Sequence, residues 1–271
     1  MHQRPRRGCV HAARRVTVGR AQGFAARQAA CRGRTGFVGG YPAGCLLFMN
    51  RVLRLSLYRW LLARRPLVAG LAATLLATGF LQLGDEVGEG DTRGFDMLVL
   101  LGAQALRAKH PWLTDVLRDL SGLGSTTVLA LVAVAAVGYV ALFSSRRAAL
   151  LLAVSVASGS GLVSVFKWAF GRLRPEAAHA GLVVPGWSFP SGHASMAAIV
   201  FLTLGALVAA TRSTAVERVY LLAFAATMTV LVGLSRVGLG VHWATDVLGG
   251  WAFGSAWAIT WWWLARTRGI R

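Results

Sequence analysis

Six long apolar runs limit what this chain of 271 residues can fold into. Each run is close to the length of about 20 residues that a helix needs to cross the hydrocarbon core of a bilayer. Only 14% of the residues are charged, against about a quarter in an ordinary soluble domain. We therefore predict an all-α fold, a polytopic membrane helical bundle with six transmembrane helices. The predicted spans are Pro66–Gly84, Leu123–Phe143, Ala148–Phe166, Ala194–Ala210, Val219–Gly233 (extending to about Ser235) and Trp243–Leu264.

The first 48 residues differ in composition from the rest of the chain. Arginine, alanine and glycine dominate them, and none is acidic. Such a segment is typical of a targeting sequence, a disordered arm or an extension that is not native. Met49 then opens a basic stretch that suits the start of a membrane protein. We predict a disordered or non-native basic extension over 1–48 and a membrane domain over 49–271.

The formal net charge of +19 would suit nucleic-acid binding, but its distribution indicates a membrane surface. Fourteen arginines lie within residues 1–65, and many other basic residues lie in short loops, as expected beside anionic lipid. The basic arm also lacks the interleaved aromatic side chains on which single-stranded nucleic acids stack. We expect membrane lipids, and no nucleic acid, as partners.

The loops also predict an orientation. In a six-span topology the N-terminal arm, the loops at Arg146–Arg147 and Arg212–Arg218, and the C-terminal tail share one side. That side holds 21 of the 29 lysines and arginines but only one acidic residue, Glu217. Basic loops are enriched on the cytoplasmic side of membranes. We expect a multi-pass protein of the cell membrane, with both termini cytoplasmic and its polar clusters on the extracytoplasmic side.

Three polar clusters, each at the end of an apolar run, carry the candidate chemistry. The first is the sequence KWAFGRLRP, from Lys167 to Pro175. Lys167 and Arg174 are two helical turns apart, so they should share one helix face, with Arg172 directed elsewhere, toward headgroups or Glu176. Two cations that reach for the membrane surface would explain this cluster equally well. An unpaired charge at the depth of Lys167 costs about 2.5–3.5 kcal/mol, however, and a bound anion would offset that cost.

The second cluster is the sequence PSGH, which ends at His193. Ser191 is a good N-cap for the fourth span, and the free N–H groups of a helix start bind anions. Gly192 lets a ligand approach the backbone closely, and His193 would enter a pocket from the first helical turn. A plain capping turn would explain these four residues as well.

The third cluster is the most specific. His242 and Asp246 are four residues apart at the start of the last span, so the carboxylate can bind one imidazole nitrogen and leave the other aimed outward. That arrangement prepares a histidine nucleophile or base. Arg236 can fold back toward the same pocket across a Gly-Leu-Gly turn. A structural His–Asp pair is one alternative, and a metal site completed by His193 is another, although the nearby cations would repel a metal ion.

Together the clusters resemble the three-part signature of the type 2 phosphatidic acid phosphatase family. That family includes lipid phosphate phosphatases and undecaprenyl pyrophosphate phosphatases, and it shares its site with vanadium haloperoxidases. The match covers residues 167–246 directly, and every signature position agrees in residue type, order and spacing; the arginine-rich leader is not part of the pattern. The signature positions are Lys167, Arg174, Pro175, Pro190, Ser191, Gly192, His193, Ser235, Arg236, His242 and Asp246.

The resemblance implies a phosphatase that needs neither metal nor cofactor. His242 would attack phosphorus and form a phosphohistidine, Asp246 would orient it, and His193 would protonate the leaving oxygen and then activate water. The implied substrate is a lipid phosphate or prenyl pyrophosphate, whose terminal phosphate is hydrolysed on the outer face of the membrane. The implied phosphate-binding groups are Lys167, Arg174, Ser191, Gly192 and Arg236.

Two other functions fit the same constellation. A haloperoxidase would hold vanadate in this site, and an anion or lipid-phosphate carrier would bind its ligand without turnover. The sequence does not select the lipid, because phosphatidic acid, undecaprenyl pyrophosphate and phosphatidylglycerol phosphate share the same head chemistry.

Glycines inside the spans predict close helix packing. They are Gly159, Gly161, Gly250 and Gly254. The last two also permit a homodimer contact.

Overall fold

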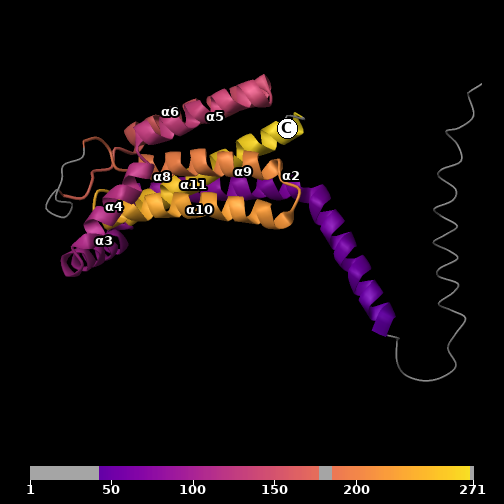
Figure 1. The fold of residues 1–271 in the computed structure, drawn as a ribbon. Helices are drawn as coiled ribbons and strands as arrows, with labels where there is room; N and C mark the ends of the chain where they lie inside the picture. The colour runs from indigo at the N-terminus through magenta and orange to yellow at the C-terminus, as the bar shows by residue number, and fades with distance from the viewer. Residues whose placement is uncertain (1–42, 177–184, 269–271) are drawn as a thin grey trace, which may run out of the picture. The chain divides into compact units, whose positions relative to one another are not determined.

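The computed structural model describes residues 43–176 and 185–268, and within these ranges it contains helices and no strands (Figure 1). The predicted all-α fold is therefore confirmed. The chain divides into two compact units, Met1–Trp60 and Leu61–Arg271. The second unit holds the predicted site and is described below. Most of the predicted extension over 1–48 lies outside the described residues.

The helices follow one another with short connections. η1 is a π-helical segment that joins α8 and α9 into one continuous span, Gly192–Ala210. The described helices, in chain order, are α2 (Ala43–Glu89), α3 (Arg93–Lys109), α4 (Trp112–Leu123), α5 (Thr126–Phe143), α6 (Arg146–Phe170), α8 (Gly192–Ala197), η1 (Ala198–Leu202), α9 (Thr203–Ala210), α10 (Ala215–Gly238) and α11 (Ala244–Thr267).

Five segments of the described residues are long and apolar enough to cross a membrane. They match five of the six predicted spans, and α11 occupies the place of the sixth. α11 is long enough to cross, but its Gly, Trp and Thr residues lower its mean hydropathy. The membrane bundle is therefore confirmed, and six is an approximate number of spans. The five segments are Pro66–Glu89, Trp112–Phe143, Arg146–Phe170, Gly192–Ala210 and Ala215–Gly238.

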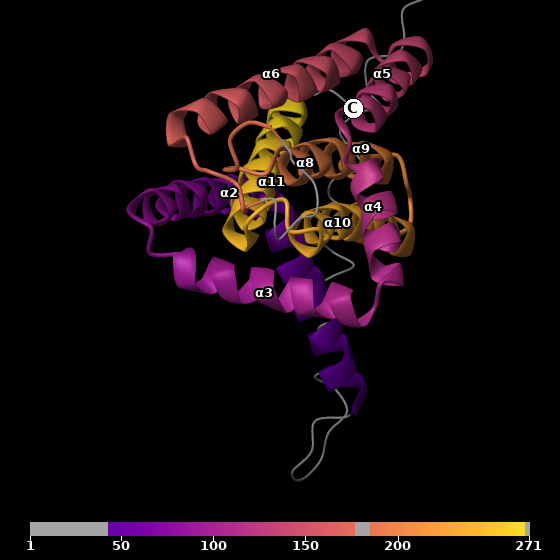
Figure 2. The same cartoon turned by 90° about the vertical axis from the view of Figure 1, so that its left-hand side faces the viewer.

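The long connection before the second predicted span is itself helical. Residues 93–109 form α3, and a further helix, α4, follows it. α3 contacts α10 and α11, while α4 packs along α10. Figure 2 faces this end of the bundle and shows α3 running across the ends of those helices. The connection therefore covers the end of the bundle at which the polar clusters lie.

α6 ends at Phe170, so the helix does not continue as far as Arg174. Gly171 follows it with φ of 56°, the left-handed conformation that glycine favours at a helix C-terminus, and its N–H bonds to the carbonyl of Lys167. Arg174 therefore lies on the loop beyond α6. The prediction that it shares a helix face with Lys167 is wrong. The two side chains still reach a common cavity, because the loop folds back toward the bundle.

An aromatic cluster packs between α2, α6 and α11. Phe80, Phe189 and Phe253 are all buried, and the rings of Phe80 and Phe189 are stacked with their centroids 5.6 Å apart. Phe189 belongs to the loop just before α8, so the cluster fixes that loop on the helices. On the outer faces of the helices, by contrast, many large apolar side chains are exposed, as expected for surfaces that contact lipid.

Glycines bring α11 close to α8. A Cβ atom on Gly254 would lie 2.6 Å from the carbonyl oxygen of Ser195, and one on Gly250 would lie 2.9 Å from that of Ser191. The predicted close packing is confirmed for both. Since this face is occupied within the chain, it is not free for a second copy, and the homodimer stays a prediction.

The two glycines of α6 differ from each other. A Cβ atom on Gly159 would lie 2.7 Å from Cδ1 of Ile199, so this glycine also permits close packing. Gly161 has no neighbouring atom of the described chain within 4 Å of its Cβ position, and the packing predicted for it is wrong.

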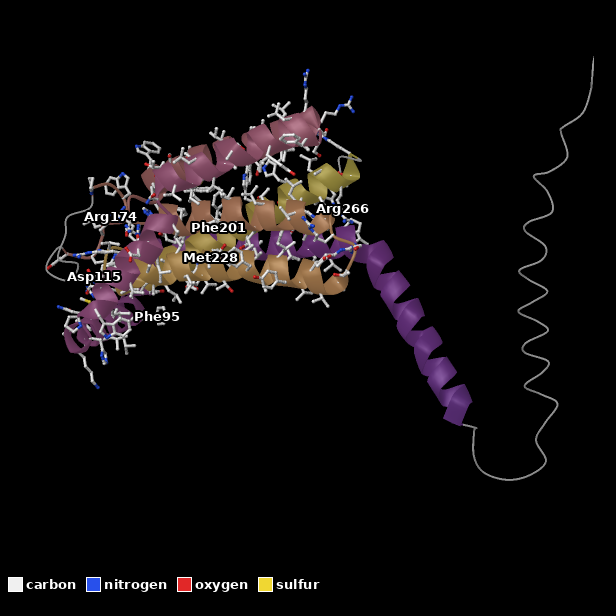
Figure 3. All side chains as sticks on the ribbon, in the orientation of Figure 1. Phe95, Asp115, Arg174, Phe201, Met228 and Arg266 are labelled. Atoms are coloured by element: carbon white, nitrogen blue, oxygen red, sulfur yellow. The ribbon has the colours of Figure 1, made fainter. Side chains whose placement is uncertain are left out.

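The predicted site and the C-terminal end of α11 lie at opposite ends of the bundle. Figure 3 shows Arg174 and Asp115 at one end of the helices and Arg266 at the other. The predicted topology requires this separation, because it places the polar clusters and the basic tail on different sides.

Replacement of Gly254 by alanine should destabilise the fold, because the added methyl group would overlap the Ser195 carbonyl. Overpacking of this kind costs about 1–3 kcal/mol. The measurement is the midpoint of thermal unfolding in detergent. Gly161→Ala is the matched control and should not lower that midpoint. Equal midpoints for Gly254→Ala and the parent protein would contradict the packing described here.

Candidate active site

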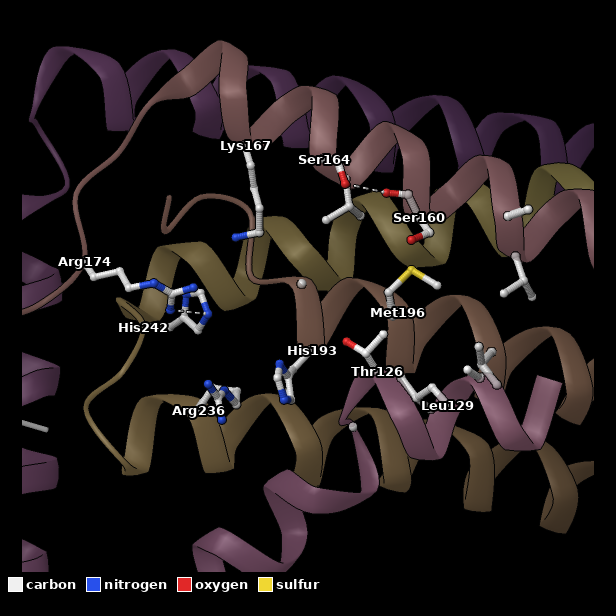
Figure 4. Close-up of a pocket in the computed structure, with 17 residues that line it drawn as sticks. Thr126, Leu129, Ser160, Ser164, Lys167, Arg174, His193, Met196, Arg236 and His242 are labelled. Atoms are coloured by element: carbon white, nitrogen blue, oxygen red, sulfur yellow. Dashed lines mark hydrogen bonds between the residues drawn. The ribbon is translucent and has the colours of Figure 1, made fainter. Parts of the chain in front are cut away.

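A cavity of about 370 Å³ lies between α5, α6, α8 and α10 (Figure 4). One end of it is cationic, and the rest is lined mainly by apolar side chains, together with the hydroxyls of Thr126, Ser160 and Ser164. The cationic end gathers side chains that are far apart in sequence: Lys167, Arg174, His193, Arg236 and His242. The apolar walls are formed by Leu129, Ala130, Val156, Ala157, Met196 and Val200. The structure thus brings the predicted cations and both predicted histidines together.

His242 is held in one tautomer by its neighbours. Its Nε2 lies 2.9 Å from Nη1 of Arg174, and because a guanidinium can only donate, Nε2 is the acceptor. The proton therefore resides on Nδ1, which donates to Oδ2 of Asp246 at 3.2 Å. The predicted contact is present, although α11 begins only at Ala244, so His242 makes it from just before the helix. A lone pair on Nε2 is what a nucleophilic imidazole requires.

Asp246 is fully buried and accepts hydrogen bonds on both oxygens. Oδ2 accepts from Nδ1 of His242, from the Trp243 N–H at 2.9 Å and from the hydroxyl of Ser188. Oδ1 accepts from Nη1 of Arg172 at 2.7 Å. These donors fix the rotation of the carboxylate and hold its charge in place.

Arg172 lies in a different environment from the one predicted. Its guanidinium does not meet Glu176 or extend to headgroups; it binds two buried carboxylates, Asp246 at 2.7 Å and Asp96 of α3 at 2.5 Å. The physical reason is the left-handed Gly171, which turns the chain out of α6 and toward the start of α11. Arg172 is therefore part of the support behind the site.

Lys167 and Arg174 converge on the loop that precedes α8. Nζ of Lys167 donates to the carbonyl of Trp187 at 2.7 Å, and Nε of Arg174 donates to that of Gly186 at 3.0 Å. Nη1 of Arg174 also donates to the carbonyl of Val241 at 2.9 Å. These carbonyl dipoles reduce the mutual repulsion of the cations and fix their directions.

The start of α8 is joined to the start of α11 through the main chain. The N–H of Ser191 donates to the carbonyl of Asp246 at 2.9 Å. Gly192 and His193 line the cavity, and a Cβ on Gly192 would lie 3.6 Å from Cε of Lys167. Within the described residues, His193 does not join His242 and Asp246 in a group that could hold a metal ion.

Two buried polar atoms have no hydrogen-bond partner in the described chain, one on a residue that lines the cavity and one on the residue before Gly192, which also lines it. They are Nε of Arg236 and Oγ of Ser191. Nη1 of Arg236 donates to the hydroxyl of Ser121 on α4 at 2.5 Å, and Ser191 holds the predicted N-cap position without a side-chain capping bond. Since buried polar atoms are nearly always hydrogen-bonded, these two suit an anionic ligand in the cavity.

Burial lowers the pKa of His242 to about 4, although the hydrogen bond to Asp246 and the charge of that carboxylate act in the opposite direction. Burial also lowers the pKa of Arg174, and the charge of Asp246 opposes that effect. His242 is therefore neutral near pH 7, which is the protonation state of a nucleophile.

Comparison with known proteins agrees with the fold and the site. The model of the PAP2 superfamily matches residues 148–270. Phosphatidylglycerophosphatase B of Bacillus subtilis (strain 168) is 34% identical over 157 residues, which are 55% of this chain and 74% of that protein. The crystal structure of a transmembrane PAP2-type phosphatidylglycerolphosphate phosphatase from Bacillus subtilis superposes with a TM-score of 0.66 at 26% identity, covering 73% of this chain and 97% of that one.

A helical membrane bundle with a cationic, two-histidine cavity and these relatives defines an integral-membrane lipid phosphatase. The chain belongs to the PAP2 superfamily. The family resemblance predicted from the three polar clusters is thereby confirmed.

Sequence reasoning missed four residues that hold the site together. Thr245 lies inside the third cluster, next to Asp246, but was given no role; Ser188 lies two positions before Pro190, so a slightly wider second cluster would have included it. Asp96 and Ser121 gave no comparable signal, because a polar residue between two membrane spans is not unusual. The four are Asp96, Ser121, Ser188 and Thr245.

The environment of His242 predicts an unusually acidic titration. The folded pKa lies below the ordinary 6.5, so the neutral Nδ1–H form should persist as the pH falls and protonation should occur only near pH 4. Nitrogen NMR of histidine-labelled protein in detergent measures both the tautomer and the midpoint, and His242→Ala identifies the signal among the six histidines. A midpoint at or above 6.5, or a proton on Nε2, would contradict this geometry.

Proposed function

We propose that this phosphatase hydrolyses the terminal phosphate of a lipid phosphate at the extracytoplasmic membrane surface, through a phosphohistidine on His242. The observation that carries the proposal is the cavity, which is cationic at one end and lined mainly by apolar side chains elsewhere. A phosphate carries a charge of about −1.5 to −2 near pH 7 and suits the cationic end. The hydrocarbon of a lipid suits the apolar walls.

The first chemical step forms the phosphoenzyme. Nε2 of His242 attacks phosphorus, and the bond from phosphorus to the leaving oxygen breaks. His193 donates a proton to that oxygen, so the dephosphorylated lipid departs neutral at that atom. Asp246 takes no proton; it accepts the Nδ1–H bond and stabilises the positive charge that develops on the imidazole ring.

The second step regenerates the enzyme. His193, now neutral, removes a proton from water, and the water oxygen attacks phosphorus. The bond from phosphorus to Nε2 breaks, which releases inorganic phosphate and returns His242 to its neutral form.

The cations of the cavity would stabilise the charge on the transferring phosphoryl group. Lys167, Arg174 and Arg236 provide fixed positive charge, and the guanidinium groups match the geometry of phosphate oxygens. The hydroxyl of Ser191 and the N–H of Gly192 would complete the set of donors. Because these groups already neutralise the anion, we propose that no metal ion takes part.

The substrate we place first is phosphatidylglycerol phosphate, since a relative of this chain is named as a phosphatidylglycerophosphatase. Phosphatidic acid and undecaprenyl pyrophosphate also carry a terminal phosphate, and they are the other two candidate substrates. The apolar walls on α5, α6 and α8 would hold a hydrocarbon chain in each case.

The proposed orientation rests on the basic residues of the loops and on the position of the cavity. Arg174 and Arg266 lie at opposite ends of the bundle, so cytoplasmic termini would place the cavity outside. An epitope attached after Arg271 should resist an impermeant protease in intact cells. Its removal without lysis would contradict this orientation.

The decisive assay measures phosphate release by detergent-purified protein from the three lipids in excess EDTA. Release should continue without metal, and His242→Ala should lose at least about 1,000-fold of the rate, because it removes the nucleophile. Acid-labile phosphate should appear on the parent protein and not on His242→Ala, with His110→Ala as the matched control. Loss of release on chelation, or full activity of His242→Ala, would contradict the mechanism. Tight phosphate binding without a phosphoenzyme would indicate a carrier.

The apolar wall predicts a variant that separates lipid from soluble substrates. Ala130→Phe on α5 should fill part of the cavity and lower kcat/KM for a long-chain lipid phosphate by about 10-fold or more, as expected when a binding wall is obstructed. Hydrolysis of a small soluble phosphate ester should change little. Ala135→Phe, on the same helix outside the cavity, is the control. Equal losses on both substrates would contradict a tail-binding role for this wall.

A further inference from the structure

Arg172 connects two carboxylates that are both shielded from solvent. Its Nη1 lies 2.7 Å from Oδ1 of Asp246, and its Nη2 lies 2.5 Å from Oδ2 of Asp96. The side chains of both aspartates are 0% exposed and that of Arg172 is 13% exposed, so the bridge is almost fully buried. Arg172 does not line the cavity, and it therefore has no place among the groups that would touch phosphate.

Asp96 also caps the helix that carries Asp246. Its Oδ1 accepts from the Thr245 N–H at 2.9 Å, and its Oδ2 accepts from the Thr245 hydroxyl at 2.6 Å. Thr245 lies in the first turn of α11, where main-chain N–H groups have no partner within the helix. α3 thus supplies a cap to a helix that begins nearly 150 residues later.

The bridge fixes the orientation of the Asp246 carboxylate toward the histidine. Oδ1 is bound by Arg172, which leaves Oδ2 for Nδ1 of His242. Rotation of the carboxylate would break the bond to Arg172 and leave a buried charge unpaired, which is strongly unfavourable. The guanidinium therefore sets the direction of the His242–Asp246 hydrogen bond without contacting the histidine.

We propose that Arg172 and Asp96 act together as positioning residues for the His242–Asp246 pair. Asp96 orients Arg172 and caps α11, Arg172 orients Asp246, and Asp246 orients the nucleophile. The inference rests on the proposed function, since it takes His242 as the group that attacks phosphorus. It assigns to the helix at the end of the bundle, α3, a part in catalysis.

The test compares Arg172→Gln and Asp96→Asn with the parent protein. Each should lower kcat by about 10- to 100-fold, because a nucleophile displaced by a fraction of an ångström reacts far more slowly. KM and the inhibition constant of inorganic phosphate should stay within about 2-fold, because the cations of the cavity are unchanged. Arg118→Gln and Asp115→Asn are matched controls; they remove the same charges from an exposed pair on α4 and should retain parental rates.

The double variant tests whether the two residues form one unit. Arg172→Gln with Asp96→Asn should be no slower than the worse single variant, since each already breaks the bridge. The proposal would be overturned if the losses of kcat in the two single variants multiplied in the double variant, or if kcat were unchanged. It would also be overturned if the inhibition constant of phosphate rose in step with the loss of kcat. If the neutral variants do not fold in detergent, Arg172→Lys decides, because an ammonium lacks the planar fork with which the guanidinium binds each carboxylate through a separate nitrogen; a parental kcat in that variant would overturn it.

His242→Ala, measured in the same assay, separates this inference from the proposed function. An inactive His242→Ala together with fully active Arg172 and Asp96 variants would overturn the positioning role alone. An active His242→Ala would overturn the proposed function itself.

Discussion

The site depends on the hydrogen bonds that the buried carboxylate of Asp246 accepts. A buried charge of this kind is stable only where donors surround it, and here they come from three parts of the chain. The loop after α6 contributes Arg172, the loop before α8 contributes Ser188, and the start of α11 contributes His242 and Trp243. The fold therefore brings these segments together around one anion, and His242, the proposed nucleophile, is oriented as a consequence.

The cations on the other side of His242 present the opposite problem, because Lys167, Arg174 and Arg236 repel one another. Each is directed by a neutral acceptor: main-chain carbonyls for the first two and the Ser121 hydroxyl for the third. Neutral acceptors hold a cation in place without cancelling its charge. The positive potential of the cavity is therefore available to a phosphate, and the donors are oriented before it binds.

Much of this arrangement could be predicted from the sequence, and the reasons for success and failure are physical. Burying a charged residue at the end of an apolar run costs free energy unless a partner or ligand compensates it, so the three clusters were recognisable as candidate sites. Their residue types, order and spacing then indicated the family. The course of the chain after α6 could not be predicted, because Gly171 ends the helix by adopting a positive φ. A glycine within a helical pattern can also continue the helix, so the sequence does not distinguish the two outcomes. Asp96 was missed for another reason: its partners lie 76 and 149 residues away, and no local pattern reports such a contact.

Helix packing and the geometry of the two histidines have a common cause. Gly250 lets α11 approach α8 so closely that the backbone of one touches the backbone of the other. At that distance the Ser191 N–H reaches the Asp246 carbonyl, which fixes the first turns of the two helices against each other. His193 lies two residues after Ser191, and His242 lies four residues before Asp246. Both histidines therefore enter the same cavity from the junction that this hydrogen bond holds together. The small residues that allow dense packing in a membrane therefore also fix the spacing of the two groups that would handle the proton and the phosphorus.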